Sequence, residues 1–276
     1  MGIVNVTPDS FSDGGRYLEP QVAIEHGLRL ADEGAKLLDI GGESTRPGAL
    51  PVALEEELRR VLPVVEGLAA RGCGVGGAAE ISIDTAKAAV ASAAFAAGAS
   101  FLNDVTALEG DPRMAELVAR SGAECCLMHK RGDPRDMQIA PEYEDVVSEV
   151  KAFLEARLRF AVSEGIDERR IVLDPGIGFG KTCAHNLELL RRLDEIAALG
   201  RPVLIGTSRK SFLGRIAAEA AGASNSVPPD QRLPGTIASN VLALQRGARI
   251  FRVHEVAPVR DALALAAATL GCRWKG

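Results

Sequence analysis

Eight short apolar runs recur along the chain, spaced so that a helix fits between each pair, and this repeat constrains the fold most. They are Gly2–Val6, Leu37–Ile40, Ile81–Ile83, Phe101–Asn103, Cys125–Met128, Ile171–Leu173, Val203–Ile205 and Ile250–Arg252. Continuous apolar runs are typical of parallel strands that are buried on both faces. Eight such units in 276 residues predict an α/β fold, a (β/α)8 TIM barrel with outer helices, as one domain over residues 1–276. The alternative is a doubly wound open sheet, which usually has fewer strands and one dominant glycine-rich turn.

Segments with helical periodicity lie between these runs. They are Gln21–Glu33, Leu54–Ala70, Ala86–Ala97, Arg113–Arg120, Tyr143–Ser163, Ala184–Leu199, Thr236–Arg246 and Ala257–Leu270. The loops Thr7–Tyr17 and Gly41–Pro51 are longer than the usual connection of about four to six residues, and such loops often serve as functional lids.

Composition narrows the possible partners. The net charge is −5 and no basic block occurs, so nucleic acid is not expected as a partner. The longest apolar stretch, Ala86–Leu102, carries Lys87 and reads as a helix packed on a sheet, and no leader is visible. We therefore expect a cytoplasmic protein without membrane contact. The five cysteines are irregularly spaced, and adjacent Cys125 and Cys126 are interpreted as small buried apolar residues.

Polar motifs follow several of the predicted strands. They are Asn5–Phe11, Gly41–Gly48, Asp84–Thr85, Asp174–Gly180 and Ser208–Phe212. In a (β/α)8 barrel the loops after the strands meet at one rim, which holds the active site. The sequence therefore predicts one small-molecule pocket built from residues far apart in the chain.

Acidic and amide side chains at this rim suit a heterocyclic ligand. Asp84, Asn103 and Asp174 end three predicted strands, where a carboxylate can accept paired N–H groups. Each acid alone could equally cap the following helix. Three such residues on one rim favour ligand binding.

Basic residues at the same rim suit a phosphate. They are Arg46, Arg209, Lys210, Arg252 and His254, and the loops after strands seven and eight are the usual phosphate corner of such barrels. The segment Pro175–Thr182 imitates a P-loop but has proline in place of the first glycine, so a nucleotide site is disfavoured. His26, His129 and His185 form no metal-binding pattern and are interpreted as structural.

Together these motifs resemble the dihydropteroate synthase family of the folate pathway, which joins a pterin to p-aminobenzoate. The resemblance covers the chain from Gly2 to about Leu270. It rests on Asn5–Gly15, Gly42–Gly48, Leu102–Val105, Leu127–His129, Leu173–Gly176, Gly206–Phe212 and Arg252–His254. It implies a transferase that condenses 6-hydroxymethyl-7,8-dihydropterin diphosphate with p-aminobenzoate, giving 7,8-dihydropteroate and pyrophosphate through a cationic pterin-methyl species.

The resemblance also implies roles for individual residues. The pterin site would comprise Asp84, Asn103, Met128, Asp174, Phe179, Gly206 and Lys210. The diphosphate site would comprise Asn5, Arg46, Arg252 and His254, with Mg²⁺ held by Asn5 and the diphosphate. The p-aminobenzoate site, which sulfonamide inhibitors would share, would comprise Phe11, Thr45, Pro47, Ser208 and Lys210. Catalysis would rest on Arg46, Lys210, Arg252 and His254, in a homodimer built from late helices.

Two other functions remain open. A pterin-dependent methyltransferase acting on methyl-tetrahydrofolate would share the barrel and the pterin pocket, but the chain lacks the corrinoid-ligand pattern Asp-x-His-x-x-Gly. A non-catalytic pterin-binding barrel would be expected to lose the cations for the leaving group, which this sequence retains. Pyrophosphate release on mixing both substrates would separate the synthase from both alternatives.

Overall fold

The computed structural model describes residues 1–7, 20–44, 48–132, 137 and 139–271 of the chain. Its strands are β1 (Gly2–Asn5), β2 (Leu37–Gly41), β3 (Glu80–Asp84), β4 (Phe101–Asp104), β5 (Glu124–Met128), β6 (Ile171–Asp174), β7 (Val203–Ile205) and β8 (Ala248–Phe251). They form one sheet in sequence order, with every neighbouring pair parallel. Beyond β8, Val253 pairs with Gly2, and its main-chain oxygen accepts from the Ile3 N–H at 3.0 Å. The sheet therefore closes, and the predicted barrel is confirmed.

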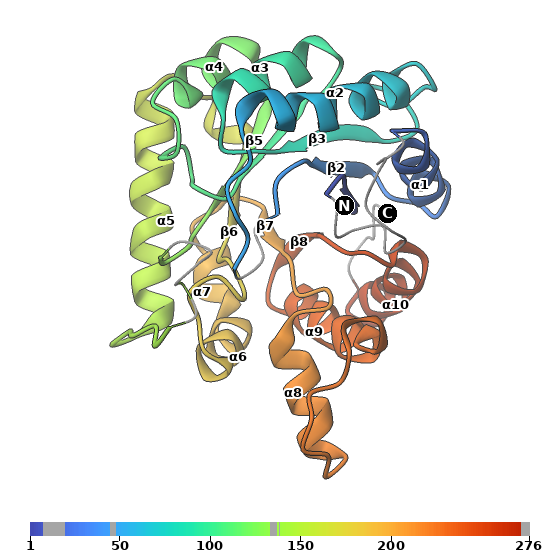
Figure 1. Ribbon diagram of the computed structural model, residues 1–276. Helices are drawn as coiled ribbons and strands as arrows, with labels where there is room; N and C mark the ends of the chain where they lie inside the picture. The colour runs from blue at the N-terminus through green and yellow to red at the C-terminus, as the bar shows by residue number, and fades with distance from the viewer. Residues whose placement is uncertain (8–19, 45–47, 133–136, 138, 272–276) are drawn as a thin grey trace.

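Helices form the outer layer of the described structure. They are α1 (Pro20–Asp32), α2 (Leu54–Ala69), α3 (Ala88–Ala96), α4 (Met114–Ser121), α5 (Val146–Ser163), α6 (Cys183–Arg191), α7 (Leu193–Ala197), α8 (Ser211–Ala220), α9 (Leu233–Gln245) and α10 (Val256–Thr269), with short 3₁₀ turns η2 (Glu168–Arg170) and η3 (Pro229–Gln231). Figure 1 shows these helices arranged around the strands. None of the described helices has both the length and the apolar character that a membrane crossing requires.

Alternation along the strands divides their side chains between two layers. Outward residues such as Ile40, Ile83 and Leu127 are fully buried against the helices. Inside the barrel a separate apolar cluster comprises Phe101, Cys126, Val172 and Leu204. Towards the carboxyl ends of the strands, buried side chains become polar: Asp39, Ser82, Asp84, Asn103 and Asp174. The barrel therefore has an apolar amino-terminal half and a polar carboxyl-terminal half.

One helical prediction was wrong, and one helix was not among the predicted ranges. The segment predicted as one helix over Ala184–Leu199 is two helices, α6 and α7, broken at Arg192, whose side chain binds Asp145 and Glu195. Helix α8 was missed because Gly214 lowers its helix propensity and Lys210 at its N-cap makes no capping bond. A Cβ at position 214 would lie 2.6 Å from the main-chain oxygen of Val227 and 2.4 Å from Nε of Arg232, so only glycine fits there. Helix α8 extends away from the barrel (Figure 1).

The described cysteines fit the prediction made for them. Cys73, Cys125 and Cys126 are buried, Cys183 is half-buried, and all four are free. Burial raises the pKa of the Cys125 thiol to about 12. Cys125 and Cys126 are thus packing residues.

Candidate active site

An ionic network fills the carboxyl end of the barrel. Arg252, directly after β8, donates from Nε to Oδ2 of Asp39 at 2.5 Å and from Nη2 to Oδ2 of Asp84 at 2.9 Å. Asn103 donates to the same Asp39 oxygen at 2.9 Å, and Ser82 donates to its other oxygen at 2.5 Å. Strands β2, β3, β4 and the end of β8 are thus joined through buried polar contacts.

Asp39 was not among the predicted site residues, although it is completely buried and contacts three of these side chains. The signal was present in the sequence, because Asp39 interrupts the otherwise apolar run Leu37–Ile40. An ionised carboxylate in such a strand needs a cation or several donors, and Arg252 supplies that cation.

The acids at the strand ends have pKa values governed by burial. Burial raises the pKa of Asp174 to about 6, opposed by the hydrogen bond from the Gly176 N–H and by the positive charge of Lys210. Burial also raises the pKa of Asp84, and the positive charge of Arg252 opposes this shift. Burial acts to lower the pKa of Arg252, but the charges of Asp39 and Asp84 outweigh it and the net shift is upward. Asp174 is therefore largely ionised at neutral pH and can accept N–H groups.

The loop after β6, residues 175–181, forms one wall of the site. The ring of Phe179 lies 4.0 Å from Nζ of Lys210, a distance that permits a cation–π interaction. Gly178 has φ +83°, and a Cβ there would come within 3.0 Å of Cδ of Lys210. Glycine at this position therefore lets Lys210 pass close to the loop.

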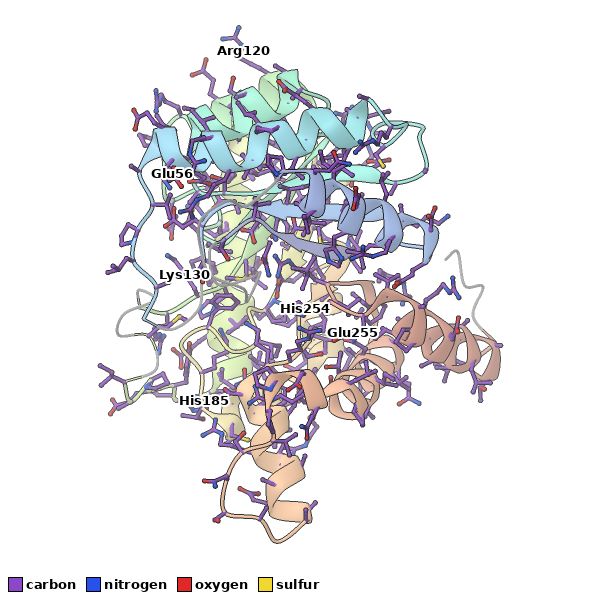
Figure 2. The ribbon with its side chains drawn as sticks, turned by 45° about the vertical axis from the view of Figure 1, so that its right-hand side comes forward. Glu56, Arg120, Lys130, His185, His254 and Glu255 are labelled. Carbon is purple, nitrogen blue, oxygen red and sulfur yellow. The ribbon has the colours of Figure 1, made fainter. Side chains whose placement is uncertain are left out.

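Ser208, after β7, and His254, after β8, contact each other at the rim. Oγ of Ser208 accepts from the His254 main-chain N–H at 3.2 Å and lies 2.8 Å from its Nδ1. The Ser208 hydroxyl can donate to Nδ1, which leaves Nε2 as the protonated ring nitrogen. Arg209 has φ +59° and pairs with Glu255. Figure 2 shows His254 and Glu255 next to each other near the centre of the view, far from Arg120 on α4.

The other predicted residues divide into two groups. Asn5 ends β1, Met128 ends β5 and Gly206 directly follows β7, so all three lie at this rim. The remaining four lie outside the described residues: Phe11, Thr45, Arg46 and Pro47. The structure therefore brings together eleven of the predicted residues, and their ligand assignments stay predictions.

A buried pair behind the loop has no counterpart among the predicted site residues. Lys181 is 1% exposed and its Nζ lies 2.9 Å from Nδ1 of His129, a histidine that the sequence marks only as structural. The two residues are 52 positions apart, so only the folded chain reveals the contact.

A cavity of about 280 Å³ lies at the opposite, amino-terminal end of the barrel. Leu37, Phe101 and Ile250 contribute to its lining, and none of the predicted site residues does. Its position at the bottom of the barrel separates it from the rim where catalytic residues of this fold collect.

The fold and the polar rim define a class of protein. A family model described as a pterin binding enzyme matches residues 1–254. Acidic and amide side chains at the carboxyl ends of β3, β4 and β6 suit the nitrogen-rich ring of such a ligand.

Individual relatives narrow the class. The chain is 48% identical to dihydropteroate synthase of Mycobacterium leprae over 271 residues, which cover 98% of this chain and 93% of the relative. It also matches the structure of Xanthomonas albilineans dihydropteroate synthase with 4-aminobenzoic acid, at 49% identity and a TM-score of 0.88, covering 99% of this chain and 93% of that one. The Yersinia pestis dihydropteroate synthase in a sulfonamide drug complex matches at 43% identity and a TM-score of 0.89, covering 98% and 94%. The chain belongs to the dihydropteroate synthase family, which confirms the resemblance found in the motifs.

Proposed function

We propose that this enzyme condenses 6-hydroxymethyl-7,8-dihydropterin diphosphate with p-aminobenzoate to give 7,8-dihydropteroate and pyrophosphate. The observation that carries the proposal is the grouping of Asp84, Asn103 and Asp174 with Arg252 at one rim of a barrel of this family. The acidic side recognises the pterin ring, and the basic side receives the leaving group. The second substrate is the compound bound in the X. albilineans relative.

The pterin side of the pocket is built from Asp84, Asn103, Met128, Asp174, Phe179, Gly206 and Lys210. Carboxylates bind the amino and ring N–H groups with charge-assisted hydrogen bonds. Met128 and Phe179 offer apolar surface to the faces of the ring. A residue with a side chain at Gly206 would extend towards Arg252, whose Cβ would lie 3.9 Å from the added Cβ.

The diphosphate side is built from Arg252 and His254, with Asn5 and Arg46. The carbon–oxygen bond between the pterin methylene and the diphosphate breaks, and its electron pair leaves on the diphosphate oxygen. The neutral aromatic amine then forms the new carbon–nitrogen bond and releases its proton to solvent. Preorganised cations beside the departing oxygens stabilise that charge, which is where such groups contribute most.

Mg²⁺ fits this site as a partner of the substrate. Within the described residues, no three His, Cys, Asp or Glu side chains are grouped to form a metal centre of their own. Mg²⁺ commonly binds through one or two protein oxygens, several waters and the phosphates of a substrate. The amide oxygen of Asn5, at the end of β1, would supply one such ligand. When bound, the ion would neutralise part of the charge on the diphosphate.

The p-aminobenzoate side comprises Ser208 and Lys210 with Phe11, Thr45 and Pro47. A sulfonamide is a shape and charge analogue of p-aminobenzoate, and a sulfonamide complex exists for the Y. pestis relative. Sulfonamides should therefore raise the KM for p-aminobenzoate without lowering kcat. Inhibition that excess p-aminobenzoate does not relieve would contradict this assignment.

The direct test is turnover. Pyrophosphate should appear only when dihydropterin diphosphate and p-aminobenzoate are mixed with the protein, and faster with Mg²⁺ than with a chelator. Methyl transfer from methyl-tetrahydrofolate, or pterin binding without turnover, would instead support one of the two alternatives.

We propose in addition that the enzyme is a cytoplasmic homodimer. Leu242 on α9 and Leu265 on α10 are 54% and 71% exposed, and these late helices pack against each other. Light scattering after gel filtration should give twice the chain mass of 29.0 kDa. The charged substitution Leu265→Glu should reduce it to one chain if this surface is the interface.

A further inference from the structure

Lys181 is a buried basic residue that the proposed reaction does not use. It is the last residue of the loop after β6, two positions before helix α6, and is 1% exposed. Its Nζ donates to the Phe179 oxygen at 3.0 Å and to the His129 oxygen at 3.4 Å, and it lies 2.9 Å from Nδ1 of His129. None of these partners is a carboxylate. Burying an ammonium group among neutral acceptors costs free energy. We therefore looked for a function that would explain a lysine at position 181.

The contacts of Lys181 belong to a set that fixes the loop after β6. The Oδ1 atom of Asn186 accepts from the Gly178 N–H at 2.7 Å, and the Tyr143 hydroxyl donates to the Gly180 oxygen at 2.9 Å. The Phe179 carbonyl between them is the one that Lys181 holds. A Cβ at Gly176 would lie 1.8 Å from the His129 oxygen, so the loop packs directly on the end of β5. The loop is therefore a rigid wall of the pterin pocket.

The ring of His129 completes the arrangement. Burial lowers the pKa of His129 to about 2, with the charges of Lys181 and Arg131 adding to the effect. The ring is neutral at pH 7, so Nδ1 can accept from the Lys181 ammonium. The Phe153 ring meets it edge-on, with the ring centroids 4.9 Å apart.

Charged groups from several elements face Lys181. Asp174 at the end of β6 favours the ammonium form, whereas Lys210 and Arg131 oppose it, and burial lowers the pKa of Lys181 to about 7. Arg131 is paired with Glu149 of α5. His185 of α6, labelled in Figure 2, has its pKa lowered by burial and then by Lys181. In return, Lys181 is one of the charges that keep the pKa of Asp174 from rising further.

We propose that Lys181 is a positioning residue for the pterin, whose ammonium holds the Phe179 wall in place and whose charge stabilises the Asp174 carboxylate. This inference rests on the proposed function, since it concerns the ring that Asp174 binds. Lys181 acts from behind the wall and does not touch the reacting atoms.

The test uses two neutral variants. Lys181→Met keeps the apolar stem as far as Cε and removes both the donor and the charge. Lys181→Gln, which is one atom shorter than lysine, keeps an N–H donor for the Phe179 carbonyl and removes the charge. At pH 7 the affinity for dihydropterin diphosphate, measured by calorimetry, should fall by roughly 10- to 100-fold in Lys181→Met. The KM for p-aminobenzoate should change much less.

The pH profile separates an electrostatic role from a structural one. Without the positive charge, Asp174 takes up its proton at a higher pH, so the acidic limb of kcat/KM for the pterin should move upward in both variants. Tyr143→Phe is the matched control, because it removes a neutral hydrogen bond to the same loop and should leave that limb in place. In the background of Asp174→Asn, the shift caused by Lys181→Gln should disappear.

The outcomes are distinct from those of the proposed function. If wild-type protein neither binds the pterin nor releases pyrophosphate, the proposed function fails. If wild type is active and neither lysine variant moves the acidic limb relative to Tyr143→Phe, Lys181 has only a structural role and this inference is overturned. If Lys181→Met does not fold, Lys181→Gln alone decides between these results.

Discussion

The two ends of the barrel interior differ in the side chains that they bury: one end is apolar and the other is polar and charged. At the amino-terminal end, Phe101, Cys126, Val172 and Leu204 form an apolar cluster that is at most 3% exposed. At the carboxyl end, strands β2, β3, β4 and β6 bury Asp39, Asp84, Asn103 and Asp174, and Arg252 pairs with the first two of them. Apolar burial stabilises a fold, whereas replacing a buried ion network by apolar residues is often neutral or stabilising. The carboxyl end is thus the part of the interior that is arranged for chemistry.

Removal of Arg252 should have a larger effect than any other single substitution at either end of the barrel. Arg252→Ala removes a cation from the leaving-group side and should lower turnover by about 10²–10³-fold while the pterin still binds. It also leaves Asp39 and Asp84 without their cation, which should destabilise the fold by roughly 3–5 kcal/mol. Steady-state kinetics and chemical denaturation measure the two effects.

The control for that variant is Arg249→Ala on β8, the strand that Arg252 directly follows. Arg249 is exposed, and its Nη1 donates to the main-chain oxygen of Ala248 at 3.1 Å. Turnover of Arg249→Ala should match wild type. Near-normal turnover in Arg252→Ala, in the presence of intact folding, would remove Arg252 from the catalytic set.

A truncation at the amino-terminal end should reverse the pattern. Leu204→Ala leaves a cavity in the inner cluster and should cost about 2–5 kcal/mol of the free energy of unfolding. Leu204 is completely buried and lies below the polar layer, so kcat/KM should stay within about twofold of wild type. A loss of activity exceeding tenfold in folded protein would show that the two ends are coupled.

Asp174→Asn should raise the stability of the fold at neutral pH while it weakens pterin binding. The pKa of Asp174 rises from its ordinary value of 3.8 to about 6, so between these pH values the folded state binds more protons than the unfolded state. Stability attributable to this group therefore falls as pH rises through that window and stays low above it. The asparagine should raise the free energy of unfolding at pH 7 by up to about 3 kcal/mol, and weaken pterin binding.

Urea denaturation at several pH values tests that prediction. The advantage of Asp174→Asn should vanish below about pH 4, where the wild-type carboxyl is protonated in both states. The asparagine Oδ1 can still accept from the Gly176 N–H, which Asp174 contacts at 2.7 Å. A variant less stable than wild type at pH 8 would mean that the charge of Asp174 supports the fold.

The sequence predicts those features of the two barrel ends that depend on neighbouring residues, and it misses those that depend on contacts between residues far apart in the chain. The apolar runs place all eight strands within about two residues, and a strand end places Asp84 and Asp174 at the rim. Asp39 was missed because it lies two residues before the end of β2 and not at the strand end. The sequence does not show which residues of β2 point into the barrel, and the structure shows that Asp39 does, because it contacts Arg252. Lys181 was missed because its partner His129 directly follows β5, 52 positions earlier in the chain.

The two differences between the predicted and observed helices arise where a tertiary contact overrides the local sequence pattern. The apolar periodicity of Ala184–Leu199 continues across Arg192, but the side chain of Arg192 bridges Asp145 and Glu195 and the helix breaks there. In α8, the glycine that lowers helix propensity is required by the close approach of the Val227 main-chain oxygen and the Arg232 side chain, which both lie beyond the end of the helix. Tertiary contacts decide both cases.

The smallest effect is expected from an ion pair on the outer surface. Glu56 of α2 accepts from Nε of Arg59 at 2.7 Å and from Nε of Arg60 at 2.7 Å, and the Arg59 bond lowers the pKa of Glu56 to about 2. Any stability from this group is present above pH 4.5 and is lost as pH falls towards 2. Solvent and salt screen such exposed pairs, so Glu56→Gln should leave the Tm at pH 7 nearly unchanged in about 0.15 M salt. A clear drop in Tm that persists in about 1 M salt would mean that this surface pair resembles the buried network around Arg252.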